Sequence, residues 1–137
     1  MKKITLLLAL GLFAITANAQ KVMESAVPAG IKAAFVKMYP GVTVTSWTQE
    51  PINNIRAEFV KDKVPTSVLM GPNNNLLETS IEISAGDLPK AISDKCAGKT
   101  ITKAYKNTSY TGVVSYKVQA GGDLYFDKDG NPAPAKK

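Results

Sequence analysis

Two stretches of the chain carry apolar residues at intervals of three and four, which is the spacing of an amphipathic helix. The first begins near Pro28 and ends at Tyr39-Pro40-Gly41, and the second has Asp87 as its expected N-cap and ends near Gly98. Cys96 falls on the apolar face of the second helix, so we expect a buried thiol rather than a reactive one. The apolar positions are Val27, Ile31, Ala34, Phe35 and Met38 in the first helix and Leu88, Ile92 and Cys96 in the second.

After each helix the apolar residues alternate with polar ones, which indicates strands of a sheet with one buried face. Turn-forming Asn, Asp and Gly residues separate these strands. Pro132 and Pro134 lie where a further strand would follow, and because proline cannot donate a ladder hydrogen bond we expect the C-terminus to fray or to form a poor edge strand there. The predicted strands span about 42–50, 54–61, 64–70 and 76–84 after the first helix, and about 100–107, 112–120 and 123–127 after the second.

The same order of helix and strands occurs twice, which indicates a duplicated unit. We therefore predict an α+β fold of tandem helix-plus-antiparallel-sheet repeats. They form one continuous sheet of about seven strands with two helices on one face and the other face open. Residues 20–86 would form the first repeat and residues 87–137 the second, within one structural domain with a shared core. The matching segments are Val27-Pro28 with Leu88-Pro89, Thr43-Val44-Thr45 with Thr100-Ile101-Thr102, and 70–75 with 126–131.

The first nineteen residues have the features of a cleavable secretory signal peptide. Met1-Lys2-Lys3 is basic, residues 4–17 are uncharged and apolar, and Ala17-Asn18-Ala19 fits a signal peptidase site. The apolar run is too short to span a hydrocarbon core of about 30 Å. We predict cleavage after Ala19, export to the periplasm as a secreted protein, and no stable membrane anchor afterwards. Loss of Lys2 and Lys3 lowers the formal net charge from +6 to +4.

The composition excludes several kinds of catalytic and binding chemistry. The 137 residues include no histidine and one cysteine, so a Ser-His-Asp or Cys-His nucleophile, a histidine-ligated zinc and an intrachain disulfide are all excluded. The basic residues are scattered, with no more than two in succession, whereas a nucleic-acid surface has clustered ones. We expect a protein that is not an enzyme, needs no cofactor and binds no nucleic acid.

The open face of the predicted sheet is the first candidate site. If Ile55, Ala57 and Phe59 face the helices, then Arg56 and Glu58 face away. The same parity places Leu69, Glu78, Glu82 and Tyr125 outward, and Trp47, which is out of phase with Val44, joins them. Trp, Tyr and Arg are enriched in binding hot spots, so the candidate partner-binding residues are Trp47, Arg56, Glu58, Leu69 and Tyr125. The alternative is an ordinary solvated sheet with Trp47 in the core at a strand end.

An acidic turn near the C-terminus is the second candidate site. Asp127, Asp129 and Asn131 have the alternate spacing that opens a calcium loop. A calcium loop also needs a later glutamate, and no acidic residue follows Asn131. A tight turn explains the same residues without metal, so calcium is the weaker interpretation.

A set of motifs along the chain is similar to that of a known family. The chain resembles the PepSY-like family of exported Bacteroidetes proteins, which is also described as beta-lactamase-inhibitor-like. The resemblance covers about residues 22–131, and Gly71-Pro72 departs from the family's Asp-containing turn. It rests on the pattern from Val27 to Pro40, on Trp47, Ala57-Glu58-Phe59, residues 75–79, Leu88-Pro89 and residues 126–131.

This resemblance implies a tandem helix-plus-sheet fold, periplasmic residence and no established enzymatic activity. Together with the open face, it predicts a non-catalytic periplasmic module that binds an unknown protein or peptide and is inhibitor-like. The alternative function is a small-ligand or calcium-responsive periplasmic sensor that uses the acidic turn.

Overall fold

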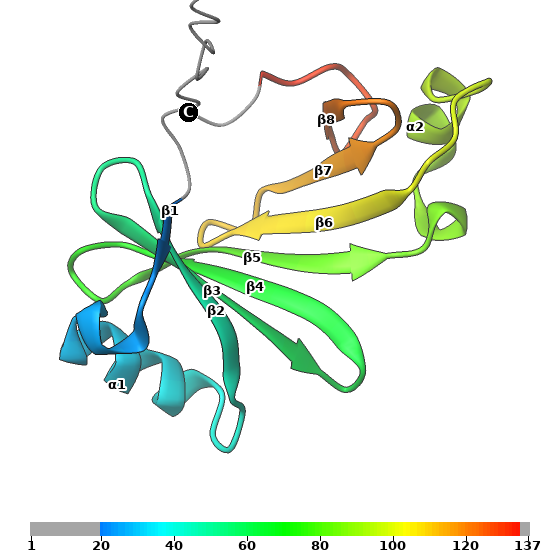
Figure 1. The fold of residues 1–137 in the computed structure, drawn as a ribbon. Helices are drawn as coiled ribbons and strands as arrows, with labels where there is room; N and C mark the ends of the chain where they lie inside the picture. The colour runs from blue at the N-terminus through cyan, green and yellow to red at the C-terminus, as the bar shows by residue number, and fades with distance from the viewer. Residues whose placement is uncertain (1–19, 135–137) are drawn as a thin grey trace, which may run out of the picture.

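The computed structural model describes residues 20–134, which form a single antiparallel sheet of eight strands and two α-helices (Figure 1). The expected signal peptide, residues 1–19, lies outside the described residues. Each strand pairs with the next one in the sequence, so the spatial order is β1 to β8. The strands are β1 (Gln20–Val22), β2 (Val44–Glu50), β3 (Asn54–Lys61), β4 (Val64–Met70), β5 (Leu76–Ile83), β6 (Lys103–Ser109), β7 (Val114–Gln119) and β8 (Asp123–Asp127).

The α+β class and the single antiparallel sheet are confirmed, but the predicted number of strands is wrong by one. The additional strand is β1, which lies at the edge of the sheet and pairs Val22 with Trp47. Its three residues are too few to display an alternation of polar and apolar positions. Strands β3, β4 and β8 have the predicted bounds, and the other predicted strands differ from theirs by at most three residues at either end.

The two helices are α1 (Ala29–Met38) and α2 (Lys90–Lys95), each preceded by a 3-10 turn, η1 (Glu24–Ala26) or η2 (Ala85–Asp87). The prediction that Asp87 caps the second helix is wrong. Asp87 belongs to η2, where its carboxylate accepts a hydrogen bond of 2.7 Å from the Ser84 hydroxyl, and Pro89 takes the N-cap position. Leu88 is extended, with φ −68° and ψ 142°, because the residue before a proline avoids helical angles.

The order of elements repeats along the chain. The segment β1-η1-α1-β2-β3-β4 is followed by β5-η2-α2-β6-β7-β8, so each unit is a strand, a 3-10 turn, a helix and three strands. Strand β5 therefore pairs with β4, the last strand of the first unit. In the second unit, β5 takes the position that β1 has in the first.

In each unit the turn after the last strand packs on the first turn of the helix. A Cβ built on Gly30 of α1 would lie 2.5 Å from the Asn74 side chain, and one built on Gly130 would lie 2.7 Å from the Ala91 Cβ of α2. The glycine is thus on the helix in one unit and in the turn in the other. Asn74 and Gly130 both have positive φ, at 63° and 84°.

Both helices lie on one face of the sheet, over two clusters of buried side chains. The cluster under α1 is built around Phe35, with Trp47 and Phe59 packed edge-on at ring-centroid distances of 5.9 and 5.1 Å. The cluster under α2 contains Ile92 and Cys96, which confirms the prediction of a buried thiol. The buried members are Val27, Ile31, Phe35, Trp47, Ile55, Ala57, Phe59, Val68 and Met70 in the first cluster, and Leu88, Ile92, Cys96, Ala104, Val118, Ala120 and Phe126 in the second.

The last described residues run along the outer edge of β8. Pro132 forms a single antiparallel bridge with Phe126, and the Ala133 N–H donates a hydrogen bond of 2.9 Å to the Tyr125 carbonyl. Of the two expected outcomes, fraying or a poor edge strand, residues 132–134 are closer to the second, and Pro132 contributes no N–H to extend the pairing. Among residues 20–134, no helix has the length and the apolar character needed to cross a bilayer.

Candidate functional site: the open sheet face

The open face is the side of the sheet turned away from α1 and α2. Its strand positions follow from the register, in which Ala57 and Val68 face the helices and their neighbours Glu58 and Ser67 face away. The candidate residues Arg56, Glu58, Leu69 and Tyr125 all lie on this face, as their parity predicts. Arg56 pairs across to Leu69, and Leu69 pairs with Glu78 on the next strand.

Trp47 is not on the open face, and its assignment there is wrong. Its exposed fraction is 6%, and it pairs with Ala57 and packs against Phe35 under α1. The cause is a register shift between Val44 and Ser46, because a bulge adds one residue and reverses the alternation beyond it. The alternative of a Trp47 that belongs to the core is therefore the correct one.

The open face is hollowed, although neither helix covers it. Thr48, Glu78 and Asn107 lie on it with exposed fractions of only 9%, 6% and 7%. Polar side chains on an uncovered sheet reach such values only when the surrounding side chains enclose them. The sheet that carries them is strongly twisted, as Figure 1 shows, and side chains of neighbouring strands line the hollow around them.

Two adjoining cavities occupy this hollow. One, of about 410 Å³, is lined by Glu50, Arg56, Glu58, Ser67, Glu78, Ser80, Tyr105, Asn107, Lys117, Gln119 and Tyr125. The other, of about 320 Å³, is lined by Thr45, Glu58, Phe59, Val60, Pro65, Thr66, Ser67, Ser80, Glu82, Lys103 and Tyr105. They share Glu58, Ser67, Ser80 and Tyr105, so the hollow is continuous from β3 to β6.

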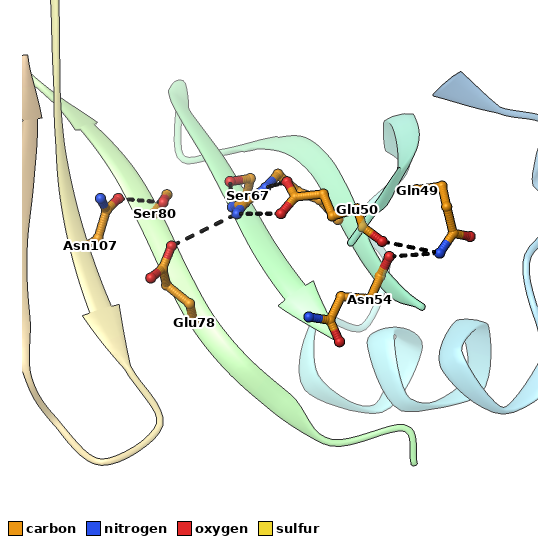
Figure 2. Close-up of polar contacts among 8 residues, drawn as sticks. Gln49, Glu50, Asn54, Ser67, Glu78, Ser80 and Asn107 are labelled. Atoms are coloured by element: carbon orange, nitrogen blue, oxygen red, sulfur yellow. Dashed lines mark hydrogen bonds and ion pairs between the residues drawn. The ribbon is translucent and has the colours of Figure 1, made fainter. Parts of the chain in front are cut away.

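On β4 to β7 the floor of the hollow consists of the short side chains Ser67, Ser80, Asn107 and Ser115, and larger ones stand on both sides. A row of residues paired directly with one another, here called the serine row, crosses the sheet between these two sides, and four of its seven members are serines. The Ser80 hydroxyl lies in hydrogen-bonding contact with the Asn107 side chain within this row (Figure 2). Because large side chains flank small ones, the face forms a trough that runs across the strands. The serine row is Ser46, Glu58, Ser67, Ser80, Asn107, Ser115 and Asp127.

Arg56 organises one side of the trough. Its Nε and Nη2 donate to the Glu50 carboxylate at 2.5 and 3.4 Å, and its Nη1 donates to the Ser67 hydroxyl at 3.1 Å. Nη2 also lies 3.8 Å from the buried carboxylate of Glu78 (Figure 2). The guanidinium is thus held by two carboxylates, and a bidentate contact of this kind fixes its orientation.

The other side of the trough combines aromatic rings with a lysine. Glu82, Tyr105, Lys117 and Tyr125 pair in succession across β5 to β8. The Lys117 ammonium lies 5.9 Å from the centre of the Tyr125 ring and 3.1 Å from the Asp123 carboxylate. Tyrosine rings beside a charged group offer both apolar contact and hydrogen bonding, as interface residues commonly do.

Several residues of the trough were missed by reasoning from the sequence. They are Glu50, Ser67, Ser80, Tyr105, Asn107, Lys117 and Gln119. The signal that could have found them is the alternation itself, since Lys117 lies between the inward positions Tyr116 and Val118. A search restricted to aromatic and charged residues overlooks the serines, whose small size is what makes the trough.

The acidic turn at 127–131 uses its carboxylate within the turn. One oxygen of Asp127 accepts the N–H groups of Asp129 and Asn131, both at 2.9 Å, and the other accepts the Asn131 amide at 3.0 Å. The hydrogen bond from the Asn131 side chain, followed by the one from its backbone, holds the pKa of Asp127 below the ordinary value. A calcium ion would have to replace these bonds, and residues 20–134 contain no group of three or more His, Cys, Asp or Glu side chains that could hold a metal ion.

Comparisons with known proteins identify similar solved structures only. No family model matches the chain, and no curated protein matches it. A periplasmic protein of Bacteroides eggerthii is similar with a TM-score of 0.69 and 17% identity, over 79% of this chain and 86% of that one. A DUF2874 family protein of Bacteroides uniformis gives 0.68 and 18%, over 80% and 88%.

A third similar structure is that of a BLIP-like protein of Bacteroides fragilis, with a TM-score of 0.59 and 22% identity over 80% of this chain and 84% of that one. Each similarity extends over most of both chains, so it concerns the whole sheet rather than one unit. The comparisons show the fold of this chain, which it shares with BLIP-like and DUF2874 proteins of Bacteroides.

Proposed function

We propose that this chain is a non-catalytic periplasmic module that binds a protein or peptide in the trough of its open face. The observation that carries the proposal is the hollow itself. It is a cavity of about 410 Å³ on a sheet face that neither helix covers, and charged and aromatic residues of both units line it. Such a concave surface with a few fixed polar groups is typical of a binding site.

The arrangement of side chains also favours binding over catalysis. The Arg56 guanidinium is held by Glu50, Ser67 and Glu78 in a fixed geometry. A rigid, pre-organised polar surface loses little conformational entropy when a partner binds. The chain has no histidine and its one cysteine is buried, so the common nucleophile and base pairs are missing.

The similar structures support the periplasmic and non-catalytic parts of this proposal. One is named a periplasmic protein and another a BLIP-like protein. From the motifs in its sequence, we also propose that the chain belongs to the PepSY-like family and resides in the periplasm after cleavage of residues 1–19.

Site-specific photo-cross-linking in the periplasm tests the proposed function. A photoreactive amino acid at Tyr105 lies in the trough, whereas one at the exposed Ala33 lies on α1 and serves as the control. We expect a defined protein to be cross-linked from position 105 and not from position 33. Cross-linking from position 33 alone would place the partner on the helical side and overturn the proposal.

A further inference from the structure

The charges that line the trough are divided unevenly between the two halves of the sheet. Strands β2 to β5 contribute Glu50, Glu58, Glu78 and Glu82 with Arg56, whereas β6 and β7 contribute Lys103 and Lys117 and no carboxylate. Among these lining residues one half is therefore acidic in sum and the other is basic, while Asp123 and Asp127 of β8 also lie on the open face, beside Lys117 and at the end of the serine row. This division runs along the serine row, across the strands.

Internal ion pairs do not remove this polarity. Arg56 pairs with both Glu50 and Glu78, so it does not face the trough as a free cation. Glu58 and Glu82 form no salt bridge with any residue in 20–134, and neither does Lys103. The pair of Lys117 with Asp123 is partly exposed, at 28% and 46%, and such pairs are weak enough to exchange partners.

We propose that the trough takes an extended segment of a partner protein that carries a lysine or arginine over β3 to β5 and an aspartate or glutamate over β6 and β7. This inference rests on the proposed function and states the chemistry of the partner. Opposite charges placed at the two halves would each meet a complementary surface, whereas a segment with only one sign of charge would meet repulsion at one of them.

The strand spacing gives the separation of the two charges in the partner. Glu82 and Lys117 are two strands apart and Glu58 and Lys117 are four apart, so at about 4.8 Å per strand the charges lie roughly 10 to 19 Å from each other. An extended chain advances about 3.3 Å per residue, so the basic and acidic residues should be about three to six positions apart. The short side chains of Ser67, Ser80 and Asn107 leave room for the backbone between them.

Two synthetic peptides of identical composition and about nine residues test this inference. In one, Lys and Glu are separated by four serine or glycine residues, and in the other they are adjacent. Each is titrated into the mature chain while backbone amide chemical shifts are recorded. We expect the spaced peptide to shift resonances of β3 to β7 and to bind about fivefold more tightly than the adjacent one.

The variant Glu58→Gln with Glu82→Gln should remove this preference, whereas Asp62→Asn with Asp94→Asn, at exposed sites outside the trough, should retain it. Equal binding of the two peptides, or shifts outside the open face, would overturn the inference. The proposed function has a separate test, in which Ser80→Tyr places a large side chain in the floor of the trough. If the two peptides bound equally but Ser80→Tyr still weakened binding of the partner identified by cross-linking, the trough would remain the binding site and only its charge preference would be wrong.

Discussion

At the scale of single residues, Arg56 has more influence on the open face than any other cation. It is the only arginine of the chain, and a lysine could not reach Glu50 with two nitrogens and Ser67 with a third. Its side chain is 18% exposed, and the Glu78 carboxylate beside it is 7% exposed. The loss of Arg56 would therefore leave two carboxylates close together, one of them buried.

Replacing Arg56 by methionine should lower the free energy of unfolding by about 2–3 kcal/mol, because a buried carboxylate that loses its cation is costly. The matched control is Lys90→Met, which breaks the exposed pair of Lys90 with Asp94 and should cost less than about 0.5 kcal/mol. Urea denaturation at neutral pH measures both. Equal losses in the two variants would show that the Arg56 network does not stabilise the face.

The Asp127 turn gives a prediction for pH. Its pKa is lowered, so the turn stabilises the fold above the ordinary carboxyl pKa, and this contribution is lost as the pH falls through the lowered pKa. Removing the Asn131 side chain by Asn131→Ala should raise the pKa of Asp127 toward its ordinary value, as followed by carboxyl NMR. Asn73→Ala, in the exposed turn of the first unit, should leave it unchanged. An Asp127 pKa that Asn131→Ala does not move would contradict this assignment.

At the scale of elements, the sequence predicts strands from the alternation of their own residues. It misses features that depend on pairing with a neighbouring strand. The strands β3 to β5 follow from the alternation of polar and apolar residues in their sequences. In β3 this alternation matches the observed burial, whereas in β5 the open-face Glu78 is buried and the helix-side Ile81 is exposed. The three residues of β1 show no such pattern, and their strand exists only because β2 offers a free edge. The bulge before Trp47 is likewise invisible in the pattern, although it decides which face that residue occupies.

The contact between the Gly130 turn and α2 gives a prediction at this scale. Gly130→Ala should destabilise the protein by about 2 kcal/mol, because its φ of 84° disfavours a side chain and the new Cβ would lie 2.7 Å from Ala91. Gly86→Ala is the control, since its Cβ would meet nothing closer than 3.8 Å, and it should change stability by less than about 0.5 kcal/mol. The midpoint of thermal or urea unfolding measures the difference. A Gly130→Ala protein as stable as the Gly86→Ala one would contradict this packing.

At the scale of the whole molecule, the open face could be predicted but the trough could not. Alternation predicts that Arg56 and Glu58 face away from the helices, and it does so from a few neighbouring residues. The hollow depends on the twist of eight strands and on short side chains placed in line on separate strands, such as Ser67, Ser80 and Ser115. These residues are far apart in the sequence, and only the pairing of strands brings them together.

The central claim is that the trough is the binding surface, and a large side chain placed in its floor tests this most directly. Ser80 lines both cavities, whereas Ser25 is exposed in η1, outside both of them. The measurement is the dissociation constant of the purified, cross-linked partner for the wild type, Ser80→Tyr and Ser25→Tyr. We expect Ser80→Tyr to weaken binding by about tenfold or more and Ser25→Tyr to leave it unchanged. Equal affinity of the partner for all three proteins would contradict the claim.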